Sequence, residues 1–128
     1  MSSAETALRA DDTVPGFEAY LGARALLVVL SDKRFGDLRV IDETPLSLGR
    51  GPGCGLRIRD PEVSDEHCRI DRSGGRGFFL EDCGSRNGTL VNGRWVRDPV
   101  RLQYGDRIRI GSTILRFFIE ELAGPRGG

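Results

Sequence analysis

Cysteine and histidine are scarce in this chain, and their scarcity excludes the protein classes that depend on them. The three cysteines, Cys54, Cys68 and Cys83, are odd in number and form no CxxC pair, which argues against a disulfide framework or a zinc site. His67 is the only histidine, and a catalytic metal site needs about three protein ligands. We therefore expect no metal and no cofactor, and unpaired thiols point to a reducing, cytoplasmic setting.

Long apolar runs and an excess of one charge are also missing. No stretch approaches the ~18 apolar residues of a membrane span, and residues 1–20 lack the apolar core of a signal peptide. The formal net charge is zero, so no overall field would draw the chain to nucleic acid or to an anionic membrane. We therefore expect neither nucleic acid nor a membrane among its partners.

Catalytic and nucleotide-binding motifs are absent as well. The glycine-rich residues 49–55 lack the Lys-Ser or Lys-Thr pair that ends a P-loop, and no dinucleotide fingerprint fits them. His67 with Ser64 or Ser85 would supply two members of a hydrolase triad, but no serine lies in a nucleophile elbow. Cys68 follows His67 directly, so on a strand the two side chains would point to opposite faces. We expect His67 to be a hydrogen-bonded structural residue, and we expect no catalytic residue.

Glycine, in contrast, is abundant, and its 18 residues separate short apolar runs, a pattern typical of a turn-rich β protein. Asn92-Gly93 supplies the two positive-φ residues of a type I′ hairpin turn, and Ser73–Gly75 and Gly111-Ser112 are further hairpin signals. Arg107–Ile110 alternates with period two, so one face of that strand should be buried. We predict an all-β protein, a β-sandwich of about eleven short, mostly antiparallel strands. The strands that the pattern places are 25–30 (a buried apolar run), 38–41, 45–48, 67–71, 78–81, 89–91, 94–96, 107–110 and 113–120.

The two ends of the chain are polar and weakly patterned. We expect residues 1–22 to be a flexible tail, 23–121 a single domain and 122–128 a linker or tail. Phe17, Tyr20 and Leu21 could form one short helical turn that docks on the domain. Such tails suggest the amino-terminal module of a larger regulator, for example a transcription activator, a kinase or a secretion component.

Three expected strand-end loops each carry a donor suited to phosphate. Arg50 follows an apolar strand, Ser64 lies in the loop before His67, and Ser85-Arg86-Asn87 forms a third loop. Arginine, hydroxyl and backbone amide donors are the groups from which an anion site is built. Loops on a rigid sandwich are also where recognition usually occurs, so these loops are candidates for one binding site.

At these positions the chain resembles the forkhead-associated (FHA) domain, a reader of phosphothreonine with a SMAD/FHA-like sandwich. The resemblance covers about residues 24–121, and the order and spacing of its motifs make it specific. The matching segments are Leu48–Arg50, Val63–His67, Asp82–Thr89, Val91–Gly93, Leu102–Asp106 and Ile108–Gly111.

The resemblance implies a role for each matching residue. Arg50 corresponds to the arginine that contacts the phosphate, Ser64 to the serine that holds another phosphate oxygen, and Asn87 to the asparagine that bonds the peptide backbone. Arg86 stands where the family often has Thr or Ser, also facing the phosphate. His67 corresponds to the structural histidine that fixes the Ser64 loop, and the positions expected to shape the backbone are Gly49, Gly88, Asn92 and Gly93.

The family reads phosphothreonine without catalysis and distinguishes it from phosphoserine by a small pocket for the threonine methyl group. The resemblance therefore implies a phosphothreonine-containing protein as the partner. Thr13 in the acidic tail, once phosphorylated, could occupy the domain's own site. Some bacterial members of the family regulate themselves by binding their own tail in this way.

The chain departs from the family at Asp65, where a basic or neutral residue is usual. A carboxylate repels phosphate, and we expect Arg86 to offset it as a second phosphate clamp, although a solvated loop arginine is the alternative. Glu62 is expected to favour basic residues at the third position after the phosphothreonine, the alternative being an exposed carboxylate without a role. Asp65 and Glu66 also leave open a degenerate FHA domain, a protein-interaction platform that needs no phosphate.

Overall fold

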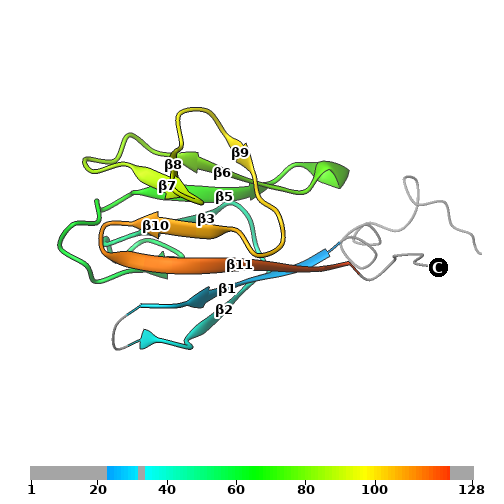
Figure 1. The fold of residues 1–128 in the computed structure, drawn as a ribbon, viewed down its shortest axis with the longest axis horizontal. Helices are drawn as coiled ribbons and strands as arrows, with labels where there is room; N and C mark the ends of the chain where they lie inside the picture. Colours follow the sequence, from blue (N-terminus) through cyan, green and yellow to red (C-terminus); the bar gives the residue numbers. More distant parts are fainter. Residues whose placement is uncertain (1–22, 32–33, 122–128) are drawn as a thin grey trace, which may run out of the picture.

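Eleven short strands form two sheets that pack face to face (Figure 1). The structure, a computed structural model, describes residues 23–31 and 34–121. The first sheet has six strands, in the order β2 (Leu38–Ile41), β1 (Ala23–Val29), β11 (Thr113–Glu121), β10 (Arg107–Ile110), β7 (Thr89–Val91) and β8 (Arg94–Trp95). The second has five strands, in the order β4 (Leu56–Arg57), β3 (Leu46–Gly49), β5 (Cys68–Arg72), β6 (Phe78–Asp82) and β9 (Val100–Arg101).

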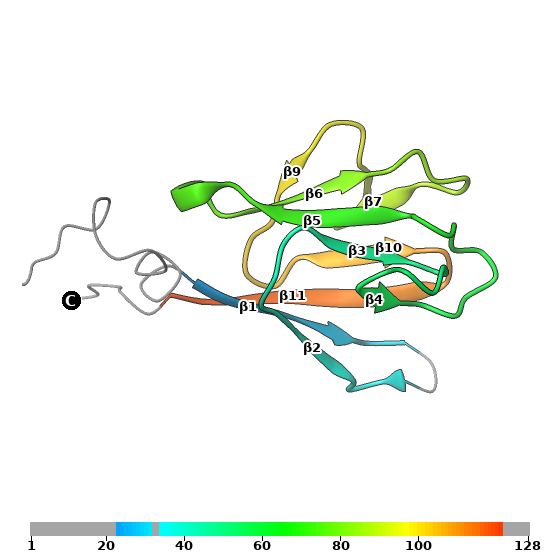
Figure 2. The same cartoon turned by 180° about the vertical axis from the view of Figure 1, so that it is seen from behind.

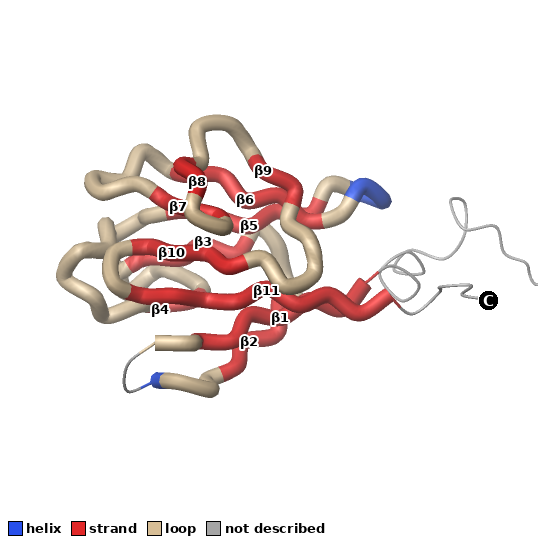
Figure 3. Tube along the Cα trace, in the orientation of Figure 1, coloured by secondary structure: helices blue, strands red, loops and turns tan. Residues whose placement is uncertain are grey.

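The predicted fold class is confirmed. Strands and loops make up nearly all of the described chain, and helix is confined to short turns such as η2 (Gly74–Arg76) (Figure 3). Strand β3 pairs in parallel with β4, and the other strand pairs are antiparallel. Among the described residues there is no helix long and apolar enough to cross a bilayer.

The core lies between the sheets because alternate side chains of each strand point inward. Ile108 and Ile110 are buried, and Arg107 and Arg109, which alternate with them, are exposed, as the period-two spacing predicts. Phe78 of one sheet contacts Phe117 of the other, with ring centroids 5.9 Å apart and planes inclined by 59°. These contacts fix the two sheets against each other, so the loops that leave them have a rigid base.

Strand β1 corrects one prediction, since it is not a fully buried run. Ala25, Leu27 and Val29 are buried, whereas Leu26 and Val28 are only half-buried. The outer face of an antiparallel sheet meets solvent, and the side chains on that face of β1 happen to be apolar. The run of apolar residues therefore gave no sign that buried and half-buried side chains alternate along β1.

Two strands, β4 and β9, were not predicted. Each has only two residues, and each exists because a neighbouring strand supplies its hydrogen bonds, with Leu56 opposite Leu48 and Val100 opposite Leu80. The β5–β6 connection also differs, since η2 replaces a tight hairpin turn. His67 lies just before β5, which begins at Cys68, and both side chains are buried.

The connections β1–β2, β4–β5, β6–β7 and β10–β11 gather at one end of the sandwich (Figures 1 and 2). At the opposite end Ala23 pairs with Glu121, and η2 also lies there. The expected tails, 1–22 and 122–128, lie outside the described residues, as do Thr13 and the helical turn expected at Phe17, Tyr20 and Leu21.

Candidate functional site

Arg50 follows β3 directly and is held against the loop that joins β4 to β5. Its backbone N–H donates to the carbonyl of Ser64 at 2.9 Å, and its side-chain Nε donates to the carbonyl of Val63 at 2.9 Å. The first bond holds the backbone of Arg50 to the loop and the second fixes the direction of the guanidinium, while the side chain stays 43% exposed. Arg50 therefore presents a positioned cation at the loop end of the sandwich.

Gly49 allows this close approach of the two loops. A Cβ on Gly49 would overlap the carbonyl oxygen of Asp65, so any larger residue would push the loops apart. The same oxygen accepts hydrogen bonds from the backbone N–H of Gly51 at 3.1 Å and from the thiol of Cys54 at 3.0 Å. The shaping role expected for Gly49 thus has a steric basis, whereas the contact of Cys54 was not predicted.

Ser64 connects the β4–β5 loop with the β6–β7 loop. Its hydroxyl oxygen accepts a hydrogen bond from the backbone N–H of Arg86 at 2.9 Å, so the hydroxyl hydrogen remains available for a ligand. Asn87 makes the second connection, its side-chain amide donating to the carbonyl of Glu62 at 2.9 Å. The two loops are thereby joined at two points, through residue pairs that are 22 and 25 positions apart in the sequence.

The Arg86 side chain is only weakly held. It is exposed, and its guanidinium lies 3.4 Å from the carbonyl of Pro61, at the long limit for a hydrogen bond. The guanidinium can therefore turn toward a ligand without losing a strong contact.

His67 fixes the Ser64 loop from beneath. It is fully buried; its Nδ1 accepts the backbone N–H of Ser64 at 3.1 Å, and its Nε2 lies 2.8 Å from the carbonyl oxygen of Gly88. This pattern assigns the hydrogen to Nε2. Both ring nitrogens are occupied, so neither can accept a proton from the Ser64 hydroxyl, as a hydrolase would require. Next to it, burial raises the pKa of the Cys68 thiol and keeps it protonated.

Asp82 organises the β6–β7 loop, a role that the sequence reasoning missed. Its carboxylate accepts the hydroxyls of Ser85 and Thr89, each at 2.6 Å, and the backbone N–H groups of Gly84 and Ser85 at 2.9 and 3.0 Å. Burial alone would raise the pKa of Asp82, but these four hydrogen bonds together lower it below the ordinary value. An aspartate two residues before Gly-Ser, as in Asp82-Cys83-Gly84-Ser85, is the local signal for such a turn.

Ser85 is engaged within its own loop. Its hydroxyl donates to Asp82 and accepts the backbone N–H of Gly88 at 2.9 Å. Gly88 has a φ of 84°, and a Cβ there would meet the ring of Trp95. The loop that carries Arg86 and Asn87 is therefore closed by a hydroxyl and requires glycine at its last position.

Asn92 lies apart from the three loops. It has a φ of 52° in the β7–β8 turn, followed by Gly93 at 83°, as the type I′ pattern predicts. Its side chain donates to Asp106 at 2.8 Å and accepts the backbone N–H of Arg107 at 2.9 Å. Asn92 shapes the turn and ties it to β10.

Three carboxylates modify the charge around these donors. Asp65 is 79% exposed, and one of its oxygens lies 3.9 Å from the Arg50 guanidinium. Glu62 accepts the hydroxyl of Ser112 in the β10–β11 turn at 2.8 Å. Asp60 is buried, and although burial would raise its pKa, hydrogen bonds from the backbone of Glu62 and Ser112 and from the hydroxyl of Thr113 lower it. The unusual Asp65 is thus next to the cation, as its sequence position suggested.

The described residues include no group of histidine, cysteine or acidic side chains that could hold a metal ion. Three hydrogen-bond donors lie on or against residues 61–64 of the β4–β5 loop instead: the hydroxyl of Ser64 and the guanidinium groups of Arg50 and Arg86, which contact the carbonyls of Val63 and Pro61. Donors of this kind bind an anion with several oxygens.

A family model described as the FHA domain matches residues 46–111. Glycogen accumulation regulator GarA of Mycolicibacterium smegmatis is 35% identical to this chain over 123 residues, which covers 96% of this chain and 74% of GarA. A structure solved for the structural and functional analysis of phosphothreonine-dependent FHA domain interactions is 30% identical, with a TM-score of 0.67, and the match covers 74% of this chain and 95% of that one.

Mycobacterium tuberculosis EmbR in complex with a low affinity phosphopeptide is 26% identical, with a TM-score of 0.68, over 81% of this chain and 26% of EmbR. The family model spans the loops that carry Arg50, Ser64 and Asn87, and GarA aligns along nearly the whole chain. On these grounds the chain belongs to the FHA domain family.

Proposed function

We propose that this chain is a non-catalytic module that binds phosphothreonine in a partner protein. The observation that carries the proposal is the joining of three loops at one end of the sandwich. Arg50 bonds the β4–β5 loop through Val63, and Ser64 and Asn87 join that loop to the β6–β7 loop. In this arrangement Arg50 and Ser64 bind the phosphate, and Asn87 binds the backbone of the peptide.

The physical chemistry of phosphate favours such a site. Phosphothreonine carries nearly two negative charges and three acceptor oxygens, and each hydrogen bond to a charged group contributes about 1.5–3 kcal/mol. Three or four such bonds, less several kcal/mol for ordering the peptide, lead to a dissociation constant in roughly the micromolar range. Affinity of this order suits reversible signalling.

The relatives support the same class of function. GarA is named as a regulator, and one structural neighbour comes from work on phosphothreonine-dependent interactions of FHA domains. The occupied ring nitrogens of His67 argue against a hydrolase built on Ser64. We propose that the module spans residues 23–121, because the pairing of β1 with β11 runs from Ala23 to Glu121, and that it works in the reducing cytoplasm, where its unpaired cysteines are stable.

Within the site, we assign Arg86 as a second phosphate clamp. Its guanidinium is exposed and weakly held, and the hydroxyl of the neighbouring Ser85 is committed to Asp82 and Gly88. Ser85 therefore serves to position the loop, and Arg86 supplies the charge. Phosphopeptide titration of Arg86→Ala tests the assignment, and an unchanged affinity would reject it.

Glu62 is proposed as a specificity residue. Its exposed carboxylate is held by Ser112 at 2.8 Å, beside the carbonyl that Asn87 binds. A peptide bonded to Asn87 would pass this carboxylate, which favours basic and disfavours acidic side chains nearby. An oriented phosphopeptide library is expected to show that bias at the third residue after the phosphothreonine, and an acidic preference there would refute it.

The direct test is calorimetric titration with three peptides of one sequence that carry phosphothreonine, phosphoserine or unmodified threonine. Binding is expected to be strongest for phosphothreonine and undetectable for threonine, and Arg50→Ala is expected to abolish it. Equal binding of the phosphorylated and unmodified peptides would overturn the proposal.

A second candidate function is a protein-interaction platform that needs no phosphate. The observation in its favour is the Asp65 carboxylate, 3.9 Å from the guanidinium of Arg50, where it competes with a phosphate for that cation. A pull-down from cell extract with and without phosphatase treatment separates the two. Capture that survives both phosphatase and Arg50→Ala favours the platform.

A further inference from the structure

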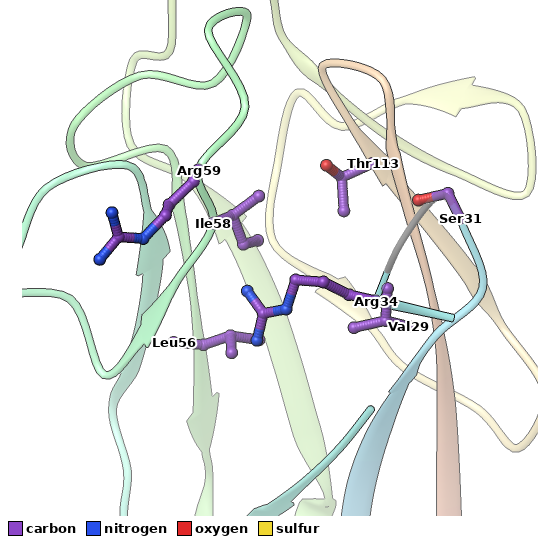
Figure 4. A pocket seen from close by; sticks show the side chains of 7 residues that line it. All are labelled: Val29, Ser31, Arg34, Leu56, Ile58, Arg59 and Thr113. Atoms are coloured by element: carbon purple, nitrogen blue, oxygen red, sulfur yellow. The ribbon is translucent and has the colours of Figure 1, made fainter. Parts of the chain in front are cut away.

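A small pocket opens at the edge of the sandwich, between the end of β1 and the edge strand β4 (Figure 4). Its apolar floor consists of Val29, Leu56 and Ile58, which are buried core residues. Thr113 and Ser31 line its other side, and the cavity itself amounts to about 50 Å³. The pocket therefore has room for the apolar part of a single side chain.

Arg34 and Arg59 give this pocket a cationic rim. Arg34 reaches across the opening toward Leu56, and Arg59 extends from the rim (Figure 4). Arg34 donates through Nε to Asp37 at 2.9 Å and through a terminal nitrogen to the carbonyl of Arg57 at 3.2 Å. Arg59 is exposed, and no hydrogen bond or ion pair engages it within the described part of the chain. One guanidinium is thus anchored in place and the other is uncommitted.

Two carboxylates, those of Asp37 and Asp60, offset the charges of the two arginines. Asp37 offsets Arg34 through its ion pair. Asp60 lies behind Thr113, but its carboxylate is buried and engaged by the hydroxyl of Thr113 and the backbone N–H groups of Ser112 and Glu62. Neither carboxylate pairs with Arg59, so among the described residues its exposed guanidinium has no ion-pair partner and is the cation available to an anion at the mouth.

The segments that line the pocket are hydrogen-bonded to those that carry the proposed phosphate site. The backbone N–H of Ile58 donates to the carbonyl of Gly49 at 2.7 Å, and Arg57 Nε donates to the carbonyl of Arg50 at 2.9 Å. Along the other side, Glu62 bonds Ser112, the residue before Thr113. The pocket and the proposed phosphate site thus share the β4–β5 loop, which carries Arg59 as well as Ser64.

We propose that this pocket is a second subsite, which accepts an anionic side chain of the same phosphothreonine peptide. The proposal rests on the proposed function of the first site. The apolar floor would pack against the methylene groups of the side chain, and Arg59 with Arg34 would bind its charged end. A glutamate carboxylate and a second phosphate share this chemistry. Glu62 lies between the subsites and repels an anion placed beside it. The preference for anionic side chains is therefore confined to peptide residues that reach the pocket.

The experiment is a positional scan with a phosphothreonine peptide whose other residues are neutral. One glutamate is moved through every position on both sides, and the dissociation constant is measured by fluorescence anisotropy at low and high salt. A second series carries a second phosphothreonine in place of glutamate and distinguishes the two anion sources. Both series are measured with the wild-type chain, with Arg59→Gln and with Arg76→Gln, an exposed arginine of η2 at the opposite end of the sandwich.

We expect a gain in affinity at positions on one side of the phosphothreonine only. The gain should be about two- to fivefold, because the ion pair between the added anion and Arg59 is partly exposed. The gain should fade with salt, disappear in Arg59→Gln and persist in Arg76→Gln. If the parent peptide binds but no position gives a gain, or if the gain survives Arg59→Gln, the subsite is wrong and the proposed function stands. If neither the phosphopeptides nor the unmodified threonine peptide binds, both proposals fall.

Discussion

The hydroxyl of Ser64 accepts a hydrogen bond from the backbone N–H of Arg86 at 2.9 Å, across 22 positions of sequence. This single contact joins two loops that leave different strands of the same sheet. It also orients the hydroxyl, because an oxygen that accepts from the protein directs its own hydrogen outward. Ser64 is therefore both a connector of the site and a donor for the ligand.

The first prediction concerns this double role. Ser64→Ala should weaken phosphothreonine binding by about 2 kcal/mol, or roughly thirtyfold, because it removes a hydrogen bond to a charged group. It should lower the free energy of unfolding by only about 1 kcal/mol, since one internal hydrogen bond is lost. Calorimetry and urea denaturation measure the two effects. Ser73→Ala, in the exposed β5–β6 connection, serves as the control and should change neither quantity.

The second prediction concerns the charge beside Arg50. Asp65→Asn should raise the affinity for a phosphothreonine peptide by about two- to fivefold at low salt, because it removes an exposed carboxylate 3.9 Å from the guanidinium. The gain should shrink as salt is added. Glu66→Gln, the exposed neighbour, should give a smaller gain. An affinity that falls in Asp65→Asn would show that the carboxylate helps to orient Arg50 rather than competing with phosphate.

The third prediction concerns His67, which fixes the site without facing the ligand. His67→Ala leaves the backbone N–H of Ser64 and the carbonyl of Gly88 without their buried partner, and it opens a cavity. The free energy of unfolding should fall by about 2–4 kcal/mol, as chemical denaturation would measure. A loss below about 0.5 kcal/mol would contradict the role of His67 as the support of the Ser64 loop.

The fourth prediction concerns acid stability. The pKa of Asp82 is lower in the folded chain than its ordinary value of 3.8, so the folded state binds protons less readily than the unfolded state. Its contribution is fully present above about pH 4 and is lost as the pH falls through the folded pKa. Asp82→Asn should therefore be less stable than the wild type at pH 7, and the difference should narrow below about pH 4. Denaturation midpoints measured from pH 7 to pH 2 check this, and a constant difference would contradict it. Asp42→Asn, at an exposed position, provides the control.

Much of the fold follows from local patterns in the sequence. Arg107–Ile110 alternates as a half-buried strand should, and Asn92-Gly93 adopts the positive φ angles that its turn requires. Strands β4 and β9 could not be predicted, because two residues carry no periodicity and each strand depends on hydrogen bonds from a distant partner. The outer face of β1 was misread, since its half-buried side chains are also apolar.

The candidate site was predictable as a set of residues but not as an arrangement. The order of Arg50, Ser64 and Asn87 identified the loops, yet only the structure reveals which hydrogen bonds join them. Asp82 was overlooked because one of its four hydrogen bonds comes from Thr89, seven positions away. The link between Glu62 and Ser112 spans 50 positions, and no local pattern indicates a contact of that kind.

The most direct test of the central claim is a titration of the ¹⁵N-labelled chain with a phosphothreonine peptide, followed by NMR. The account predicts that the largest shifts fall on the amides of Gly51, Ser64 and Arg86 and on the side-chain amide of Asn87, with no shifts in η2. It also predicts that the unmodified threonine peptide leaves the spectrum unchanged. Shifts that cluster on other strands, or that are the same for both peptides, would contradict a phosphate site formed by these three loops.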